Sequence, residues 1–356
     1  MIHGRRFLVL CFAALFLMSP WASAAAEALD AEGLAALKAK YRRPQEVPFP
    51  TSNPLSEEKR QLGELLFFDP RLSRAQDQSC ASCHDPARSW SDGRARGIGF
   101  EGQELTRRSP GVLNLAWMAA FMWDGRAHTL EKQALLPITA PEEMNMATEL
   151  VVERLEEIPA YRELFARAFG AGDTITPDNV AAALATFQRT LVSSPAPFDR
   201  WIEGDESAIS AAAKNGFALF NGKAGCSACH SSWRFTDDSF HDIGLDSSDI
   251  GRGRFAPPSV VIMQHAFKTP TLRDLDADGF FMHDGSMRGF DEVIAHYEKG
   301  GTSRPSLSHE IRPIELSASE RAELIEFLHT LKGEALKVGR PTLPSSGALS
   351  RNEGEQ

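Results

Sequence analysis

The sequence predicts an all-α protein built from two similar domains in tandem. A five-residue motif, Cys-x-x-Cys-His, occurs twice, and the segments around the two copies follow one another in the same order. No sustained alternation of apolar and polar residues predicts a long strand. At 356 residues, the chain is also longer than one hydrophobic core usually supports.

The motif copies are Cys80–His84 and Cys226–His230. This spacing attaches a c-type haem, because two thiols bind the vinyl groups and the histidine becomes the proximal iron ligand. A zinc site is the main alternative, but it needs further Cys or His at knuckle spacing. We therefore predict two cytochrome c-like domains, each with one covalent c-type haem, attached through Cys80, Cys83, Cys226 and Cys229 and ligated by His84 and His230.

The first 24 residues predict a secretory signal peptide. Arg5 and Arg6 precede an apolar run over 7–18, and a small-residue cleavage site covers 22–24. The segment is too short for a membrane anchor. Cys11 is the one cysteine of five outside the two motifs, so haem uses every cysteine of the mature chain. We predict a soluble periplasmic protein.

The charge of the chain disfavours some classes of partner. The formal net charge is −10, and removal of two arginines with the signal peptide (−10 − 2) makes it −12. Nucleic acid and anionic membranes are poor partners for such a protein. A basic redox partner is compatible with this charge, although acidity is also ordinary among soluble proteins.

Several local signals predict helices in chain order. Ser56 can cap a helix that ends in the apolar run 65–68 before the first motif, and the run 217–220 plays the same part before the second. Thr176-Pro177 begins another helix. Ser317-x-x-Glu320 is a capping box ahead of apolar residues at i, i+3, i+4 and i+7.

The segment 237–269 is rich in Gly, Pro and Asp and predicts a loop. From these signals we expect the following organisation: a signal peptide over 1–24, a first cytochrome c-like domain over 25–200, a second over 201–340, and a disordered tail over 341–356.

The repeat predicts that the two haems differ. Phe121–Gly125 (FMWDG) resembles Phe281–Gly285 (FMHDG), and an equal step forward leads to Pro137 and to Tyr297. If this position faces the open side of each haem, proline cannot ligate iron, whereas a tyrosine oxygen can. One haem then keeps a vacant sixth site for peroxide, and the other is closed. A packed or interfacial tyrosine is the alternative role for Tyr297.

The chain resembles the bacterial di-haem cytochrome c peroxidase family, and within it the MauG-type branch. The resemblance runs from about Leu62 to Leu331. Besides the haem motifs it rests on Phe121–Ala127 (FMWDGRA), Glu142-Glu143-Met144, Thr269–Arg273 (TPTLR) and Phe281–Gly285.

The resemblance implies roles for four residues. Trp123 would lie between the haems and shorten the electron path, and Pro137 would be the pocket proline. Glu143 would move a proton between the peroxide oxygens, and Gln133 would orient peroxide or water. Without the resemblance, Glu143, Gln133 and Trp123 would be interpreted as a surface carboxylate, a solvated amide and a core aromatic.

Two differences from many family members point to the MauG-type branch. Phe100 replaces a loop histidine that closes the first haem, and no histidine occurs between His84 and His128. Tyr297 replaces a methionine ligand of the second haem. In the MauG-type branch, oxidising equivalents from peroxide oxidise tryptophan in a partner protein.

Two other differences leave questions open. Ala224 stands where the branch has an exit tryptophan, and Trp233 could replace it or simply pack against the haem. Arg108 replaces the asparagine that binds an interdomain calcium ion in the family. A guanidinium can supply positive charge but cannot be a ligand, so interdomain Ca²⁺ is possible but doubtful.

We therefore predict a periplasmic MauG-type oxidoreductase that uses hydrogen peroxide to oxidise tryptophan in a partner protein. An example is the methylamine dehydrogenase precursor, whose tryptophan tryptophylquinone cofactor is matured in this way. The alternative is a cytochrome c peroxidase supplied with electrons by a small cytochrome c or a cupredoxin. A non-catalytic electron carrier is a third hypothesis, which would leave Glu143 and Gln133 without a purpose.

Overall fold

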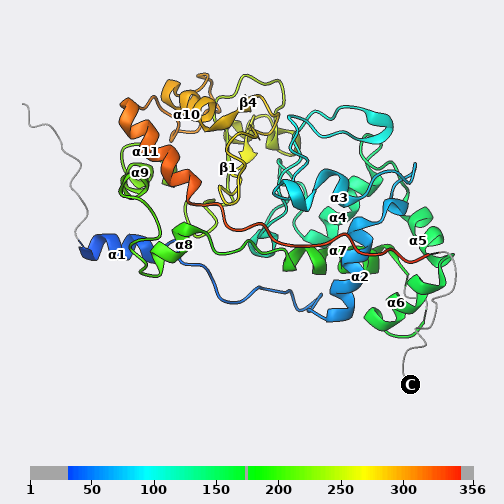
Figure 1. Ribbon diagram of the computed structural model, residues 1–356. Helices are drawn as coiled ribbons and strands as arrows, with labels where there is room; N and C mark the ends of the chain where they lie inside the picture. Colours follow the sequence, from blue (N-terminus) through cyan, green and yellow to red (C-terminus); the bar gives the residue numbers. More distant parts are fainter. Residues whose placement is uncertain (1–30, 173–174, 346–356) are drawn as a thin grey trace, which may run out of the picture.

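The computed structural model describes residues 31–172 and 175–345 (Figure 1). The predicted signal peptide and residues 346–356 of the predicted tail lie outside the described residues. The fold is mostly helical, with a few two-residue strands. The helices are α1 Ala31–Ala39, α2 Glu57–Phe68, α3 Cys80–Cys83, α4 Leu130–Thr139, α5 Thr148–Glu156, α6 Pro159–Phe169, α7 Pro177–Thr190, α8 Pro197–Ile202, α9 Ala211–Asn221, α10 Gly289–Lys299 and α11 Ala318–His329.

The predicted helix starts are confirmed. The side chains of Ser56, Thr176 and Ser317 each accept a hydrogen bond from the first turn of α2, α7 and α11, respectively. These caps satisfy backbone N–H groups that have no partner within the helix. Glu320 completes the capping box at the start of α11.

Two separate hydrophobic clusters form the cores of two halves, which lie side by side (Figure 1). The first half, residues 62–191, packs α2 against α7 and α6, and α4 against α7. The second half, residues 198–331, packs α9 against α11. Its centre is a group of aromatic rings in mutual edge or tilted contact, at Phe198, Phe217, Phe220, Phe235 and Phe327.

The same helix crossing is built twice. A Cβ added to Gly63 in α2 would lie 2.0 Å from the carbonyl oxygen of Ala183 in α7. A Cβ added to Gly216 in α9 would lie 2.0 Å from the carbonyl oxygen of Glu323 in α11. Only glycine permits backbones to approach this closely. The helix before each Cys-x-x-Cys-His motif therefore packs in the same way on a later helix of its own half.

The two ends of the described chain cross over between the halves. Helix α1 and Tyr41 belong to the hydrophobic cluster of the second half, through Leu34, Leu37 and Tyr41 itself. The segment after α11, red in Figure 1, runs back along the first half. Leu336 and Leu343 pack against the first cluster, and Arg71 donates a hydrogen bond to the carbonyl of Pro344. Residues 341–345 of the predicted tail thus contact the folded protein.

The segment predicted as a loop, 237–269, holds one short strand pair. Strand β1 (Phe240–His241) pairs antiparallel with β2 (Phe267–Lys268), and β3 (Phe280–Phe281) pairs with β4 (Met287–Arg288).

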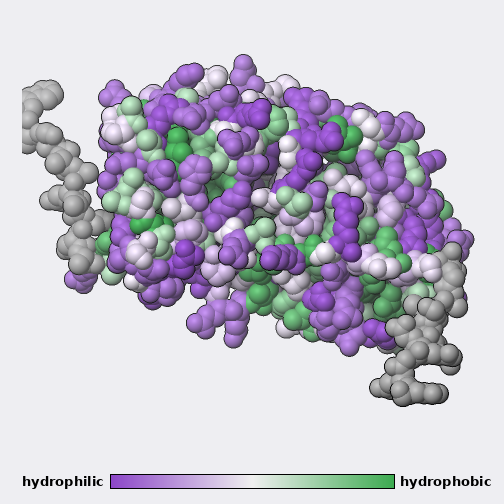
Figure 2. Space-filling view, viewed as in Figure 1, coloured by the Kyte–Doolittle hydropathy of each residue, from purple (hydrophilic) through white to green (hydrophobic). Residues whose placement is uncertain are grey.

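Hydrophilic side chains cover most of the face seen in Figure 2. No helix within the described ranges is long and apolar enough to span a membrane.

Candidate functional site

One cavity of about 1430 Å³, lined by both halves, contains every residue predicted for the site. Pockets for a single small ligand usually have a volume of roughly 300–1,000 Å³. This cavity therefore has room for more than one such ligand. The predicted residues in its lining are Cys80, Cys83, His84, Trp123, Gln133, Pro137, Glu143, Cys226, Cys229, His230 and Tyr297.

The cysteines of both motifs are free thiols next to the cavity. Burial raises the pKa of Cys80 and of Cys226 to about 12, and that of Cys83 to about 11. The thiols of Cys80, Cys83 and Cys226 are therefore protonated at neutral pH. Each pair is brought together by a single helical turn, α3 for the first motif and a 3₁₀ turn, Cys226–Ala228, for the second.

The two motif histidines are oriented in the same way. His84 Nδ1 lies 3.3 Å from the carbonyl oxygen of Trp90, and His230 Nδ1 lies 2.9 Å from that of Phe235. A carbonyl can only accept, so each Nδ1 carries the proton and each Nε2 keeps a lone pair. Burial lowers the pKa of both rings and favours the neutral form. This arrangement suits a proximal metal ligand.

The turn at Phe121–Gly125 and its repeat at Phe281–Gly285 have the same backbone conformation. Met122 and Met282 have φ of 67° and 66°, and Gly125 and Gly285 both have φ of 68°. Phe121 pairs with Ala127 across the first turn, as β3 pairs with β4 across the second. Helices α4 and α10 follow, and each ends 14 residues after the glycine of its turn, at Thr139 and at Lys299. The structure thus places Pro137 and Tyr297 at equivalent positions of equivalent helices.

Gln133, Pro137 and Glu143 line the cavity in the first half. Gln133 and Pro137 are one turn apart on α4 and share a face. The carbonyl of Pro137 accepts a hydrogen bond from the Met144 N–H at 3.0 Å, which folds the chain after α4 back beside the helix. Burial raises the pKa of Glu143, although Arg126 opposes this shift.

Tyr297 lies on α10 and faces the second motif. Burial raises the pKa of its phenol well above the usual value, and the nearby thiols of Cys226 and Cys229 contribute in the same direction. Among the described residues, its hydroxyl has no hydrogen-bond partner. Tyr297 is half-buried and lines the cavity, so its oxygen is available to a ligand there.

Trp123 is 8% exposed and lies where the halves meet. Its Nε1 donates to the carbonyl of Arg108 at 2.8 Å. Its ring contacts His283 edge-on, with centroids 6.5 Å apart. His283 was not among the predicted site residues, although the repeat signalled it as the counterpart of Trp123. Burial lowers the pKa of His283 to about 4, and its buried Nε2 lacks a hydrogen-bond partner.

Arg107 joins the halves through two carboxylates. It donates to Asp124 at 2.6 Å in the first half and to Asp249 at 2.7 Å in the second. Burial alone would raise the pKa of Asp249, but hydrogen bonds from Arg107 and the backbone of Gly251 outweigh this effect and lower it to about 2. This ion pair holds the wall of the cavity together.

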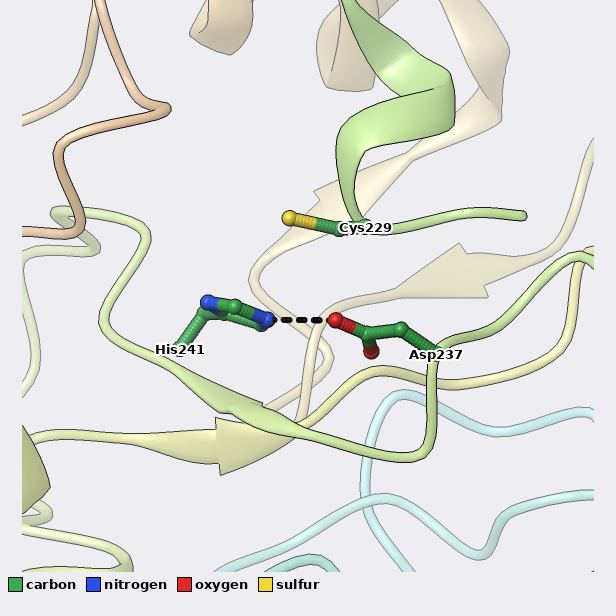
Figure 3. Close-up of side chains that lie close together, drawn as sticks. All are labelled: Cys229, Asp237 and His241. Carbon is green, nitrogen blue, oxygen red and sulfur yellow. Dashed lines mark hydrogen bonds and ion pairs between the residues drawn. The ribbon is translucent and has the colours of Figure 1, made fainter.

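Cys229, Asp237 and His241 form a cluster at the edge of the cavity (Figure 3). His241 Nε2 lies 2.8 Å from an Asp237 carboxylate oxygen, and this hydrogen bond, with one to Cys229, raises the pKa of His241 to about 10. Ligand atoms at this spacing could hold a metal ion. However, Cys229 belongs to a motif that is predicted to attach haem, so we do not assign the cluster as an independent metal site.

The described residues do not fit the interdomain calcium ion. The Arg108 side chain donates from Nε to the carbonyl of Met282 at 3.3 Å and lies over the Trp123 ring. A guanidinium has no lone pair for a metal ion and would repel one.

Trp233 does not line the cavity; it packs edge-on against Trp117, with ring centroids 4.8 Å apart.

The Phe100 segment leaves the first haem motif without a second histidine. The Phe100 N–H donates to the carbonyl of Glu142 at 3.1 Å. His84 is the one histidine of the described first half that lines the cavity. Within its described residues, the first half therefore offers the cavity no imidazole other than that of His84.

Comparison with known proteins agrees with this architecture. Residues 57–207 match the family model for di-haem cytochrome c peroxidase. The chain is 60% identical to a methylamine utilization protein MauG of Methylorubrum extorquens, over 91% of this chain and 92% of that protein. It is 56% identical to a MauG of Methylophilus methylotrophus, over 86% and 91% of the two chains. The crystal structure of a MauG-like protein associated with microbial copper homeostasis superimposes with a TM-score of 0.74, at 32% identity, over 82% of this chain and 95% of that one.

Proposed function

The chain belongs to the di-haem cytochrome c peroxidase family and is a haem-dependent oxidoreductase of the MauG type, and we propose that it uses hydrogen peroxide to oxidise tryptophan in a partner protein. We assign the methylamine dehydrogenase precursor as this partner, because both MauG relatives are methylamine utilization proteins. The proposal includes two covalent c-type haems and a periplasmic location after removal of residues 1–24.

The proposal rests chiefly on Pro137 and Tyr297. Haem at the first motif supplies the iron at which peroxide is reduced, and haem at the second stores and passes electrons. Pro137 has no donor atom for iron, so it leaves the first site open to peroxide. Tyr297 presents an unpartnered phenol oxygen to the second site. The two Cys-x-x-Cys-His motifs are alike, and this difference between α4 and α10 separates their roles.

Glu143 and Gln133 would act on peroxide. Reduction of one peroxide to two waters takes two electrons and two protons. Glu143, whose pKa is raised by burial, can accept a proton from the near oxygen of peroxide and deliver it to the departing one. Gln133 can donate an amide hydrogen bond to hold peroxide in place. The two electrons come from the tryptophan of the partner, which loses protons as it is oxidised.

Trp123 would carry electrons between the two haem sites. Its ring is buried where the two halves meet, and its indole N–H donates a hydrogen bond to the Arg108 carbonyl. A buried oxidisable ring divides one long electron transfer into two shorter ones. Its edge-on contact with His283 continues this aromatic path toward the second half.

A comparison of two substrates tests the proposal. The holoprotein is supplied with peroxide and either the methylamine dehydrogenase precursor or a reduced small cytochrome c. We expect new covalent tryptophan chemistry in the precursor, seen by mass spectrometry, and slow oxidation of the cytochrome. Fast oxidation of cytochrome c with an unchanged precursor would instead establish the peroxidase alternative. This is the activity after which the matching family is named.

A further inference from the structure

Two basic residues occupy equivalent places beside the two haem motifs. Arg108 precedes Ser109-Pro110, and Lys268 precedes Thr269-Pro270. The Arg108 N–H donates to the His283 carbonyl, and the Lys268 N–H donates to the Trp123 carbonyl, both at 2.8 Å. Since Trp123 and His283 are themselves counterparts, the two hydrogen bonds are related by the internal repeat. The backbones of Arg108 and Lys268 are thus each hydrogen-bonded to the opposite half.

Each cation is associated with its own motif. The backbone of Pro110 lies against the His84 ring, and the backbone of Pro270 lies against the His230 ring. The proline two residues after each cation is therefore in contact with the histidine of the same half. Both cations line the cavity.

Neither side chain has a carboxylate partner among the described residues. Lys268 is 9% exposed, and its ammonium donates no hydrogen bond to a described residue. Among the described residues, the Arg108 guanidinium makes one hydrogen bond, from Nε to the carbonyl of Met282. The carboxylate that acts on Arg108, Asp92, is already engaged by Ser109 and the backbone of Arg94.

The carboxylates near Lys268 are also engaged. Asp238 pairs with Arg234, and Asp237 pairs with His241. The remaining lysines and arginines of the described cavity wall are either paired with a carboxylate, as Arg107 is, or exposed, as Arg312 is. A buried cation without an anion is strongly unfavourable. Lys268 is buried and Arg108 is half-buried, and both line the cavity. Both cations therefore favour an anion within the cavity that the protein itself does not supply.

We propose that Arg108 and Lys268 are the two anion subsites of the cavity, and that each binds a propionate carboxylate of the haem held by its own half. This inference rests on the proposed function, since it takes the cavity to be a two-haem site. A haem is an apolar plate that carries two carboxylates, and each carboxylate can accept a charge-assisted hydrogen bond from a cation that lines the cavity. The Arg108 guanidinium also supplies positive charge where the two halves meet, so this place does not suit a calcium ion.

Reduction potentials test the inference. The ferric form of a haem has one more positive charge than the ferrous form, so loss of a nearby cation stabilises the ferric form. We expect Lys268→Met to lower the potential of the second haem and Arg108→Met to lower that of the first, in spectroelectrochemical titrations of the holoprotein. Lys268→Arg should restore most of the shift. Arg312→Met, which removes an exposed cation of the same cavity wall, should leave both potentials unchanged.

Unchanged potentials in both cation variants, or an equal shift in Arg312→Met, would overturn the inference. If the methionine variants do not fold, resonance Raman spectra of the wild type and Lys268→Arg provide the measurement. The frequency of the propionate bending band should differ between these two proteins, and an identical frequency would contradict the assignment. Because neither measurement uses peroxide or a partner protein, failure here is distinguishable from failure of the proposed function.

Discussion

At the scale of single residues, the two haem motifs differ through the groups that face them. Pro137 and Tyr297 lie on equivalent helices and line one cavity, yet only the tyrosine offers an oxygen. This pair was predictable from the sequence because the repeat keeps its register from FMWDG and FMHDG to both positions. The contacts of Arg108 and Lys268 with the opposite half were not predictable, because they are backbone hydrogen bonds to residues far away in the chain.

Replacement of Glu143 tests proton transfer at the peroxide site. Because burial raises its pKa, the wild-type rate constant with peroxide should rise with pH through a pKa above the usual value for glutamate. Glu143→Gln should lower this rate constant by about 10²–10⁴-fold and abolish the pH step, while both haems stay attached. Stopped-flow absorption measures both effects.

The neighbouring carboxylate is the matched control for this prediction. Glu142 also lines the cavity but is exposed. Glu142→Gln should keep the wild-type rate and pH profile. Equal losses in the Glu142 and Glu143 variants would show that general negative charge, rather than a proton-transferring group, accelerates the reaction.

At the scale of elements, local signals located the helices but not their partners. Ser56, Thr176 and Ser317 were correct helix starts because a cap is read from adjacent residues. The packing of α1 on the second half and of Leu343 on the first depends on long-range burial, which leaves no periodic signature. The structure also pairs Gly63 with Gly216, which shifts the sequence alignment of the two pre-motif helices by one residue.

The repeated helix crossing predicts equal sensitivity at Gly63 and Gly216. An added methyl group would collide with a backbone carbonyl in each case, so the helices must separate. Each Gly→Ala change should lower the free energy of unfolding by about 1–3 kcal/mol or more, despite the better helix propensity of alanine. Chemical denaturation of the holoprotein measures the loss.

Gly339 provides the control for these two changes. Nothing lies within 4 Å of a Cβ added there. Gly339→Ala should leave stability within about 0.5 kcal/mol of the wild type. A Gly216→Ala variant as stable as Gly339→Ala would refute the close approach of α9 and α11.

At the scale of the whole molecule, the link between the halves should be sensitive to acid. The pKa of Asp249 is about 2 in the folded protein, below the value of about 3.9 in an unfolded chain. Its contribution to stability is therefore complete above pH 4 and is lost as the pH falls from about 4 to 2. Asp249→Asn should remove about 1–3 kcal/mol at neutral pH and reduce the acid-dependent loss by the same amount.

Thermal unfolding at several pH values measures this effect. The control is Asp291→Asn, since Asp291 forms an exposed ion pair with Arg321 and should contribute under about 1 kcal/mol. If Asp249→Asn retained the full acid sensitivity of the wild type, Arg107 would not be the link that holds the halves together.

The central claim, that one haem site is open and the other closed by Tyr297, is tested most directly by electron paramagnetic resonance of the oxidised holoprotein. We predict one high-spin and one low-spin ferric signal in the wild type and loss of the low-spin signal in Tyr297→Phe. Tyr41→Phe, which changes a buried tyrosine of the second hydrophobic cluster that donates to Asn221, should keep both signals. Two equivalent signals in the wild type, or a low-spin signal that persists in Tyr297→Phe, would contradict the account.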